Sequence, residues 1–164
     1  MILEVTILII TSLKLVIFTC KKNYMMQISL KRIDKDFNME AKNDEGNSLL
    51  IDGSKEIGGN GKGMRPMQLI LAALGGCSSV DIISILRKQK QELDSVEIEV
   101  NGDRDPVGVE GYSLFKNIEV HFILKGNVDK DKVDRAVKLS MEKYCSVTKT
   151  LEPTAKITYK VTLN

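Results

Sequence analysis

The sequence is poor in the residues that build metal sites and disulfide frameworks. It has no tryptophan, a single histidine (His121) and only three cysteines among 164 residues. One histidine is too few for a common His-rich catalytic metal site. The cysteines, Cys20, Cys77 and Cys145, are far apart and form no CxxC pair, which argues against a disulfide framework and against a structural zinc site. We therefore expect no cofactor and no metal, and individual thiols remain as the main chemical resource.

Aromatic residues and net charge are also scarce. Phe, Tyr and Trp make up 5% of the chain, and 24 basic residues face 22 acidic ones. The basic excess lies within residues 1–24, so the remainder of the chain is balanced. A neutral chain with few aromatic rings lacks the basic face of a nucleic-acid-binding protein, and we expect no nucleic acid among its partners.

The first twenty residues are far more apolar than the rest. Glu4 and Lys14 would each cost roughly 2–3 kcal/mol near the middle of a bilayer, which disfavours a transmembrane span. No basic residue precedes the apolar run and two lysines follow it, the reverse of a secretory signal. We interpret residues 1–24 as an apolar extension outside the fold, with Met25 or Met26 as the natural start. A membrane or export role and an ordered extra strand are the alternatives.

Residues 25–164 fit a single domain of mixed helices and strands. Alternating apolar and polar residues predict strands at 27–33, 37–41, 48–52, 95–101, 117–124 and 155–163. The glycine-rich stretch 53–63 lacks the hydroxyl residue of a phosphate-binding loop and indicates a flexible surface loop. Between the last two strands, Asp129 can cap a helix whose apolar stripe runs to Tyr144, with Cys145 at its end.

Residues 67–90 predict a long helix, and Pro66 suits its first turn. Apolar residues fall on nearly every side of it, so we expect its first four turns to be buried all round. A chain of this size can surround such a helix only with difficulty, which suggests that a partner subunit covers it. Gly75 and Gly76 each cost on the order of 1 kcal/mol relative to Ala in a helix, so we expect either a bend or the close approach of another backbone.

Cys77 follows the two glycines and is the most informative residue for function. A bend there would leave backbone N–H groups free to stabilise a thiolate, whereas Asp81, one turn later, would oppose it. Cys145 could supply the second thiol of a reactive and resolving pair, in which a sulfenic acid condenses to a disulfide. The alternative is that Cys77 is a packed core cysteine, and spacing alone does not show that the two thiols meet. We expect His121 to be a half-exposed structural residue.

Two strings carry a family resemblance. Residues 65–81, RPMQLILAALGGCSSVD, resemble the central helix of the OsmC/Ohr family, and residues 139–147, LSMEKYCSV, resemble its second cysteine segment, nearest to the YhfA-like branch. The resemblance implies an α+β, OsmC-like fold in which two β-sheets wrap central buried helices in an intertwined homodimer. It also implies that Cys77 reduces organic hydroperoxides as the peroxidatic cysteine, that Cys145 resolves it, and that lipoyl or other dithiols regenerate the enzyme.

The sequence departs from the family's peroxidases at two positions. Those enzymes carry a Glu directly after the helix-starting proline, where this chain has Met67, and an Arg after the first strand, where it has Lys35 and Asp36. Arg32, Arg65 and Lys35 are the candidates to support a thiolate in their place. A thiol without a nearby cation reacts slowly, which leaves open whether the chain is an enzyme.

We therefore predict a cytoplasmic, thiol-dependent redox protein of oxidative stress defence that reduces organic hydroperoxides through Cys77 and Cys145. The alternative hypothesis is a non-catalytic redox or small-ligand-binding module that uses the same apolar pocket. The expected partners are a second copy of the chain, a small hydroperoxide substrate and a dithiol reductant such as a lipoyl protein. We expect no membrane.

Overall fold

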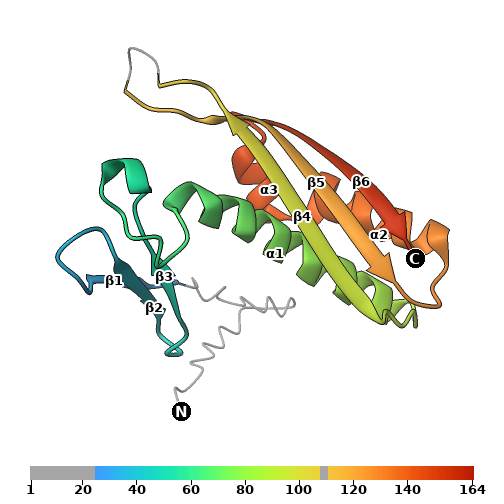
Figure 1. Cartoon of the computed structure of the whole chain (residues 1–164). Helices are drawn as coiled ribbons and strands as arrows, with labels where there is room; N and C mark the ends of the chain where they lie inside the picture. The colour runs from blue at the N-terminus through green and yellow to red at the C-terminus, as the bar shows by residue number, and fades with distance from the viewer. Residues whose placement is uncertain (1–24, 108–110) are drawn as a thin grey trace, which may run out of the picture.

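The computed structural model describes residues 25–107 and 111–164, so the predictions for residues 1–24 lie outside the described part. One three-stranded sheet lies along a long helix, and a second three-stranded sheet lies near the beginning of that helix (Figure 1). The elements follow in the order β1 (Ile28–Arg32), β2 (Met39–Asn43), β3 (Ser48–Ile51), η1 (Lys55–Ile57), α1 (Pro66–Lys88), β4 (Ser95–Arg104), β5 (Phe115–Lys125), α2 (Lys130–Leu139), η2 (Ser140–Tyr144), α3 (Ser146–Leu151) and β6 (Lys156–Leu163). The predicted α+β class with two sheets is confirmed.

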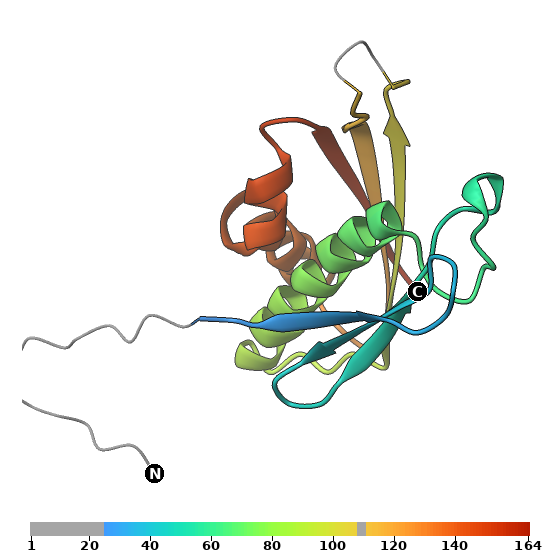
Figure 2. The same cartoon turned by 90° about the vertical axis from the view of Figure 1, so that its left-hand side faces the viewer.

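The C-terminal sheet is built on β5. β4 pairs with it antiparallel and β6 pairs with it in parallel, so the chain must cross over between β5 and β6. The helical segments α2, η2 and α3 form this crossover and lie with α1 on one face of the sheet (Figure 2). β5 turns alternate residues toward these helices, and the four that its periodicity predicted are almost completely buried: Ile118, Val120, Phe122 and Leu124.

The N-terminal sheet is an antiparallel meander of β1, β2 and β3. Its strands lie where the sequence predicted them, except that β2 begins at Met39, two residues later than expected. Its large apolar side chains remain exposed, with Ile28 at 59%, Leu30 at 56% and Leu49 at 46%. A small sheet needs a packed apolar face for stability, and one chain does not provide that cover here.

Helix α1 is covered on one side only. Its buried residues recur at helical spacing and face the C-terminal sheet and α2: Leu74, Gly75, Ser78, Ile82 and Leu86. On the opposite side Val80 is 64% exposed. The predicted burial on all sides is therefore not met within one chain, because the sheet and α2 cover the same side of the helix. By length and composition α1 could also cross a membrane, but the core helix of a soluble protein passes the same test.

The two glycines of α1 do not interrupt it. The helix runs without interruption from Pro66 to Lys88, so it frees no backbone N–H groups at Cys77. A Cβ atom at Gly75 would lie 3.3 Å from Cγ2 of Val100 on β4, whereas nothing lies within 4 Å of a Cβ atom at Gly76. The expected approach of another backbone is therefore not found, and what packs closely against Gly75 is the side chain of Val100.

The glycine-rich segment 53–63 is organised around a buried carboxylate. Asp52 is 1% exposed and accepts hydrogen bonds from the backbone N–H groups of Gly53 at 2.8 Å, Asn60 at 3.0 Å and Lys62 at 3.0 Å. These bonds, that from Lys62 above all, hold the pKa of Asp52 below its ordinary value. The segment was expected to be a flexible loop, but the hydrogen bonds of Asp52, which directly follows β3, hold it in place. Its glycine content did not indicate this order.

Candidate active site

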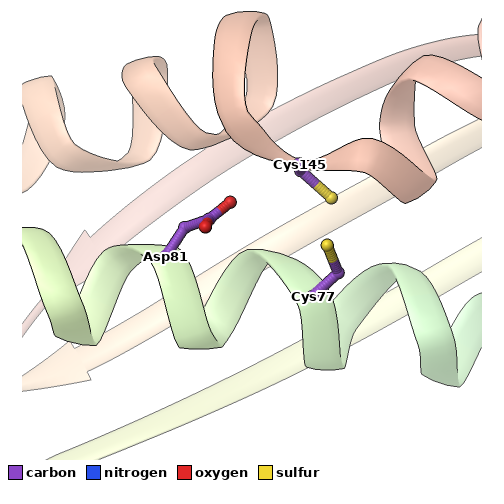
Figure 3. A group of neighbouring side chains, drawn as sticks. All are labelled: Cys77, Asp81 and Cys145. Atoms are coloured by element: carbon purple, nitrogen blue, oxygen red, sulfur yellow. The ribbon is translucent and has the colours of Figure 1, made fainter. Parts of the chain in front are cut away.

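Cys77 and Asp81 lie one helical turn apart on α1 and share one face of it (Figure 3). Cys145 approaches that face from the segment between η2 and α3. Cys77 is half-buried and packs against the core. The i, i+4 spacing on a straight helix is therefore sufficient to place a thiol and a carboxylate beside the second cysteine.

A π-helical turn decides which residue of the second segment faces α1. The N–H of Cys145 donates to the carbonyl oxygen of Ser140, five residues earlier, at 2.9 Å. Such a turn contains one residue more than an α-helical turn, so it shifts the buried stripe from position 144 to position 145. Tyr144 is accordingly 48% exposed, which corrects the predicted stripe, whereas Cys145 is completely buried.

The structure brings the two cysteines together. The sulfur atoms of Cys77 and Cys145 and a carboxylate oxygen of Asp81 all lie within 4.8 Å of one another. We call these three residues the thiol–carboxylate cluster. Both thiols are free, and their sulfur atoms would have to approach to about 2.05 Å to form a disulfide. The reactive and resolving roles of the two cysteines stay predictions.

Burial raises the pKa of the Cys145 thiol. Thr148 acts in the opposite direction through its hydroxyl and its backbone N–H, which donates to Sγ of Cys145 at 3.4 Å. The neighbouring Cys77 raises the pKa of Cys145 further. Cys145 is therefore a neutral thiol near pH 7 and must lose its proton before it can act as a nucleophile.

Asp81 is held in the cluster by Ser140. The hydroxyl of Ser140 donates to Oδ2 of Asp81 at 3.0 Å, and Ser140 is completely buried. Asp81 also lines a cavity of about 400 Å³ between α1 and the second helical segment, together with Leu139 and Tyr144. From the sequence, Asp81 was only a neighbour that opposes a thiolate. The sequence did offer one sign that Asp81 has a buried polar partner: Ser140 is a polar residue within the otherwise apolar stripe of the second helical segment.

The predicted supporting cations do not contact the cluster within this chain. Arg65 precedes Cys77 by twelve residues, which along a helix is about 18 Å at about 1.5 Å per residue. Arg32 ends β1 and Lys35 lies in the turn that follows it. In residues 25–107 and 111–164, the side-chain hydrogen bonds of Asp81 and Cys145 come from Ser140 and Thr148, and no salt bridge includes Asp81.

His121 has the structural role expected for it. Its Nδ1 lies 3.4 Å from Oε2 of Glu99 on β4, and its Nε2 lies 2.9 Å from Oγ1 of Thr162 on β6. Its side chain is 20% exposed. It links the three strands of the C-terminal sheet and does not belong to the cluster.

The comparison with known families covers the cluster itself. The model of the OsmC-like protein family matches residues 59–160, which include Cys77, Asp81 and Cys145. The chain belongs to the OsmC-like family. Protein YhfA of Escherichia coli K12 is 41% identical to this OsmC-like chain over 115 residues, which cover 70% of the chain and 81% of YhfA. The resemblance drawn from the two cysteine strings is thus confirmed.

Solved structures give the same fold. An OsmC-like protein from Mycoplasma pneumoniae matches with a TM-score of 0.72 and 19% identity, covering 86% of this chain and 98% of its own. An organic hydroperoxide resistance protein OsmC from Legionella pneumophila matches with a TM-score of 0.66 and 18% identity, covering 87% of this chain and 99% of its own. At these identities the likeness establishes the OsmC-like fold.

Proposed function

We propose that this OsmC-like chain is a cytoplasmic thiol peroxidase that reduces organic hydroperoxides in oxidative stress defence. The observation that carries the proposal is the position of two free thiols, from segments 68 residues apart, within 4.8 Å of each other. Solved relatives of the same fold from Legionella pneumophila and Elizabethkingia anophelis are described as organic hydroperoxide resistance proteins. A redox role in stress defence agrees with both observations.

The reaction divides between the two cysteines. The thiolate of Cys77 attacks the terminal peroxide oxygen, the O–O bond breaks, and the alkoxide leaves as an alcohol after taking up a proton. Cys77 is then a sulfenic acid, and the thiolate of Cys145 attacks its sulfur and expels hydroxide, which is protonated to water. One hydroperoxide and two thiols thus give one alcohol, one water and one disulfide. A dithiol such as a lipoyl protein reduces the disulfide by exchange.

The charge around the cluster predicts a slow peroxidase. A cation beside the reactive thiol favours the thiolate, whereas here the neighbouring charged group is the Asp81 carboxylate. Arg32, Arg65 and Lys35 would have to reach Cys77 from another copy of the chain to change this. We therefore expect a rate below that of a cation-assisted thiol.

The proposal includes a homodimer. One chain leaves two apolar surfaces uncovered, the open side of α1 around Val80 and the N-terminal sheet around Ile28 and Leu30. Apolar surfaces of this kind mark interaction sites in folded proteins. A second copy of the chain carries both surfaces and can cover both at once around a two-fold axis.

The test is a stopped-flow reaction of the reduced full-length chain with cumene hydroperoxide. We expect consumption of one equivalent of peroxide per chain, disulfide formation in the wild type, a trapped sulfenic acid in Cys145→Ser and no reaction in Cys77→Ser. Cys20→Ser is the matched control and should react like the wild type. A wild-type rate no higher than that of free cysteine would reject the peroxidase and favour the non-catalytic redox or ligand-binding module.

A further inference from the structure

The thiol–carboxylate cluster has the donor set of a metal site. Its two sulfur atoms and one carboxylate oxygen are ligands of borderline-soft divalent cations, and they come from two segments that the core holds in place. Three protein ligands leave a fourth position for water or another small ligand. The expectation of no metal rested on the scarcity of histidine and the lack of a CxxC pair, and neither argument applies to donors that only the fold brings together.

The separations fit a tetrahedral cation. Zinc bonds of about 2.3 Å to sulfur and about 2.0 Å to oxygen place tetrahedral ligand atoms roughly 3.5–3.8 Å apart. The three donor atoms lie within 4.8 Å of one another, so each pair has to approach by little more than about 1 Å to reach these separations. Cys77 and Asp81 share one face of the helix, and Cys145 approaches them from the opposite segment (Figure 3).

The surroundings of the cluster also suit a cation. The hydroxyl of Ser140 donates to Oδ2 of Asp81 at 3.0 Å and leaves Oδ1 for a metal, the arrangement by which outer groups orient a carboxylate ligand. Two thiolates and a carboxylate would repel one another, and no salt bridge of the described residues neutralises Asp81. A divalent cation supplies that positive charge, whereas a disulfide removes both sulfur ligands.

We propose that the reduced chain binds one zinc-like divalent cation through Cys77, Asp81 and Cys145, and that oxidation of the two thiols to a disulfide releases it. Binding converts both thiols to metal-bound thiolates and releases their two protons to solvent. Release requires a two-electron oxidant, the organic hydroperoxide of the proposed function, which takes two electrons from the thiolates and two protons from solvent and leaves as an alcohol and water. The release step rests on that function, but metal binding by the reduced chain does not.

The experiment is a titration of the reduced, metal-free full-length chain with Co²⁺ and with Cd²⁺. We expect saturation at one equivalent per chain, with thiolate-to-metal charge-transfer absorption and, for Co²⁺, the visible spectrum of a tetrahedral site. Asp81→Asn should weaken the affinity at least about tenfold. Cys77→Ser and Cys145→Ser should each remove most of the charge-transfer band.

Two matched variants serve as controls. Cys20→Ser removes the third thiol, and Asp134→Asn makes the same change as Asp81→Asn at an aspartate that pairs with Lys130 on α2. Both should bind like the wild type. The wild type oxidised to the disulfide should not bind and should recover after reduction, a result that needs no substitution. The proposal is overturned if the reduced chain shows no saturable binding, if Asp81→Asn binds like the wild type, or if the oxidised chain still binds. The peroxide assay can succeed or fail independently of each result.

Discussion

The open side of α1 gives a direct test of the proposed dimer. Val80 is 64% exposed in one chain and lies near the middle of a strongly apolar helix. If water covers this side, Val80→Asp should change the free energy of unfolding by no more than about 0.5 kcal/mol, as exposed substitutions usually do. If a second copy covers it, the same substitution places a carboxylate in an apolar interface.

The expected cost in the dimer can be worked out from burial. Loss of a buried valine costs about 1.5–3 kcal/mol, and an unpaired buried carboxylate adds to this. A two-fold interface contains the substitution twice, so the dimer loses at least about 6 kcal/mol if each copy loses about 3. Since about 1.4 kcal/mol corresponds to a factor of ten, the dissociation constant should rise by at least about 10⁴-fold.

The measurement is sedimentation equilibrium, with light scattering after gel filtration as a second readout. The wild type should be a dimer and Val80→Asp a monomer at the same micromolar concentration. Val107→Asp is the matched control, because Val107 is 69% exposed in the connection between β4 and β5, and this variant should remain a dimer. A Val80→Asp chain with the association state and unfolding midpoint of the wild type would refute the reasoning.

Two further predictions concern pH. Asp52→Asn should lower the thermal unfolding midpoint at neutral pH, and the difference should shrink in acid, because a lowered pKa contributes stability above the unfolded pKa that is lost as the pH falls through the folded pKa. An equal difference at every pH would show that the charge of Asp52 is not the cause. Because burial raises the pKa of Cys145, the step that closes the disulfide should accelerate about tenfold per pH unit from neutral into alkaline solution. Stopped-flow measurement of disulfide formation tests this, and a flat profile would contradict it.

Much of the fold is encoded in local patterns, which explains why it could be predicted from the sequence. The alternation of Ile118, Val120, Phe122 and Leu124 predicted the buried face of β5, and Asp129 caps α2 as expected, accepting a hydrogen bond from the N–H of Lys132 at 3.1 Å. The loop around Asp52 could not be predicted, because its order depends on a carboxylate bound to N–H groups up to ten residues away. A high glycine content indicates that a backbone can adopt many conformations, but it does not show which hydrogen bonds restrict that backbone in the folded protein.

The candidate site was also predictable only in part. The two cysteine strings identified Cys77 and Cys145, but their proximity depends on a π-helical turn that an α-helical periodicity does not anticipate. That turn moves Tyr144 outward and Cys145 inward by one position. Arg32 and Lys35 were candidates because they lie at the end of the first strand, and Arg65 because it directly precedes α1, but the rise of α1 carries Cys77 away from Arg65.

The charge of the cluster connects the two proposals. A peroxidatic cysteine needs positive charge beside it, but the charged member of the cluster is the Asp81 carboxylate. Among the described residues, the cluster accepts hydrogen bonds from the hydroxyl of Ser140 and the backbone N–H of Thr148. A second copy of the chain could supply a cation such as Arg32, whereas a bound divalent metal would supply the charge but occupy the sulfur needed for attack. On the two proposals, the three side chains bind a metal ion when the thiols are reduced, and Cys77 and Cys145 form a disulfide when they are oxidised. The two proposals therefore predict that a metal ion and a hydroperoxide compete for the sulfur of Cys77.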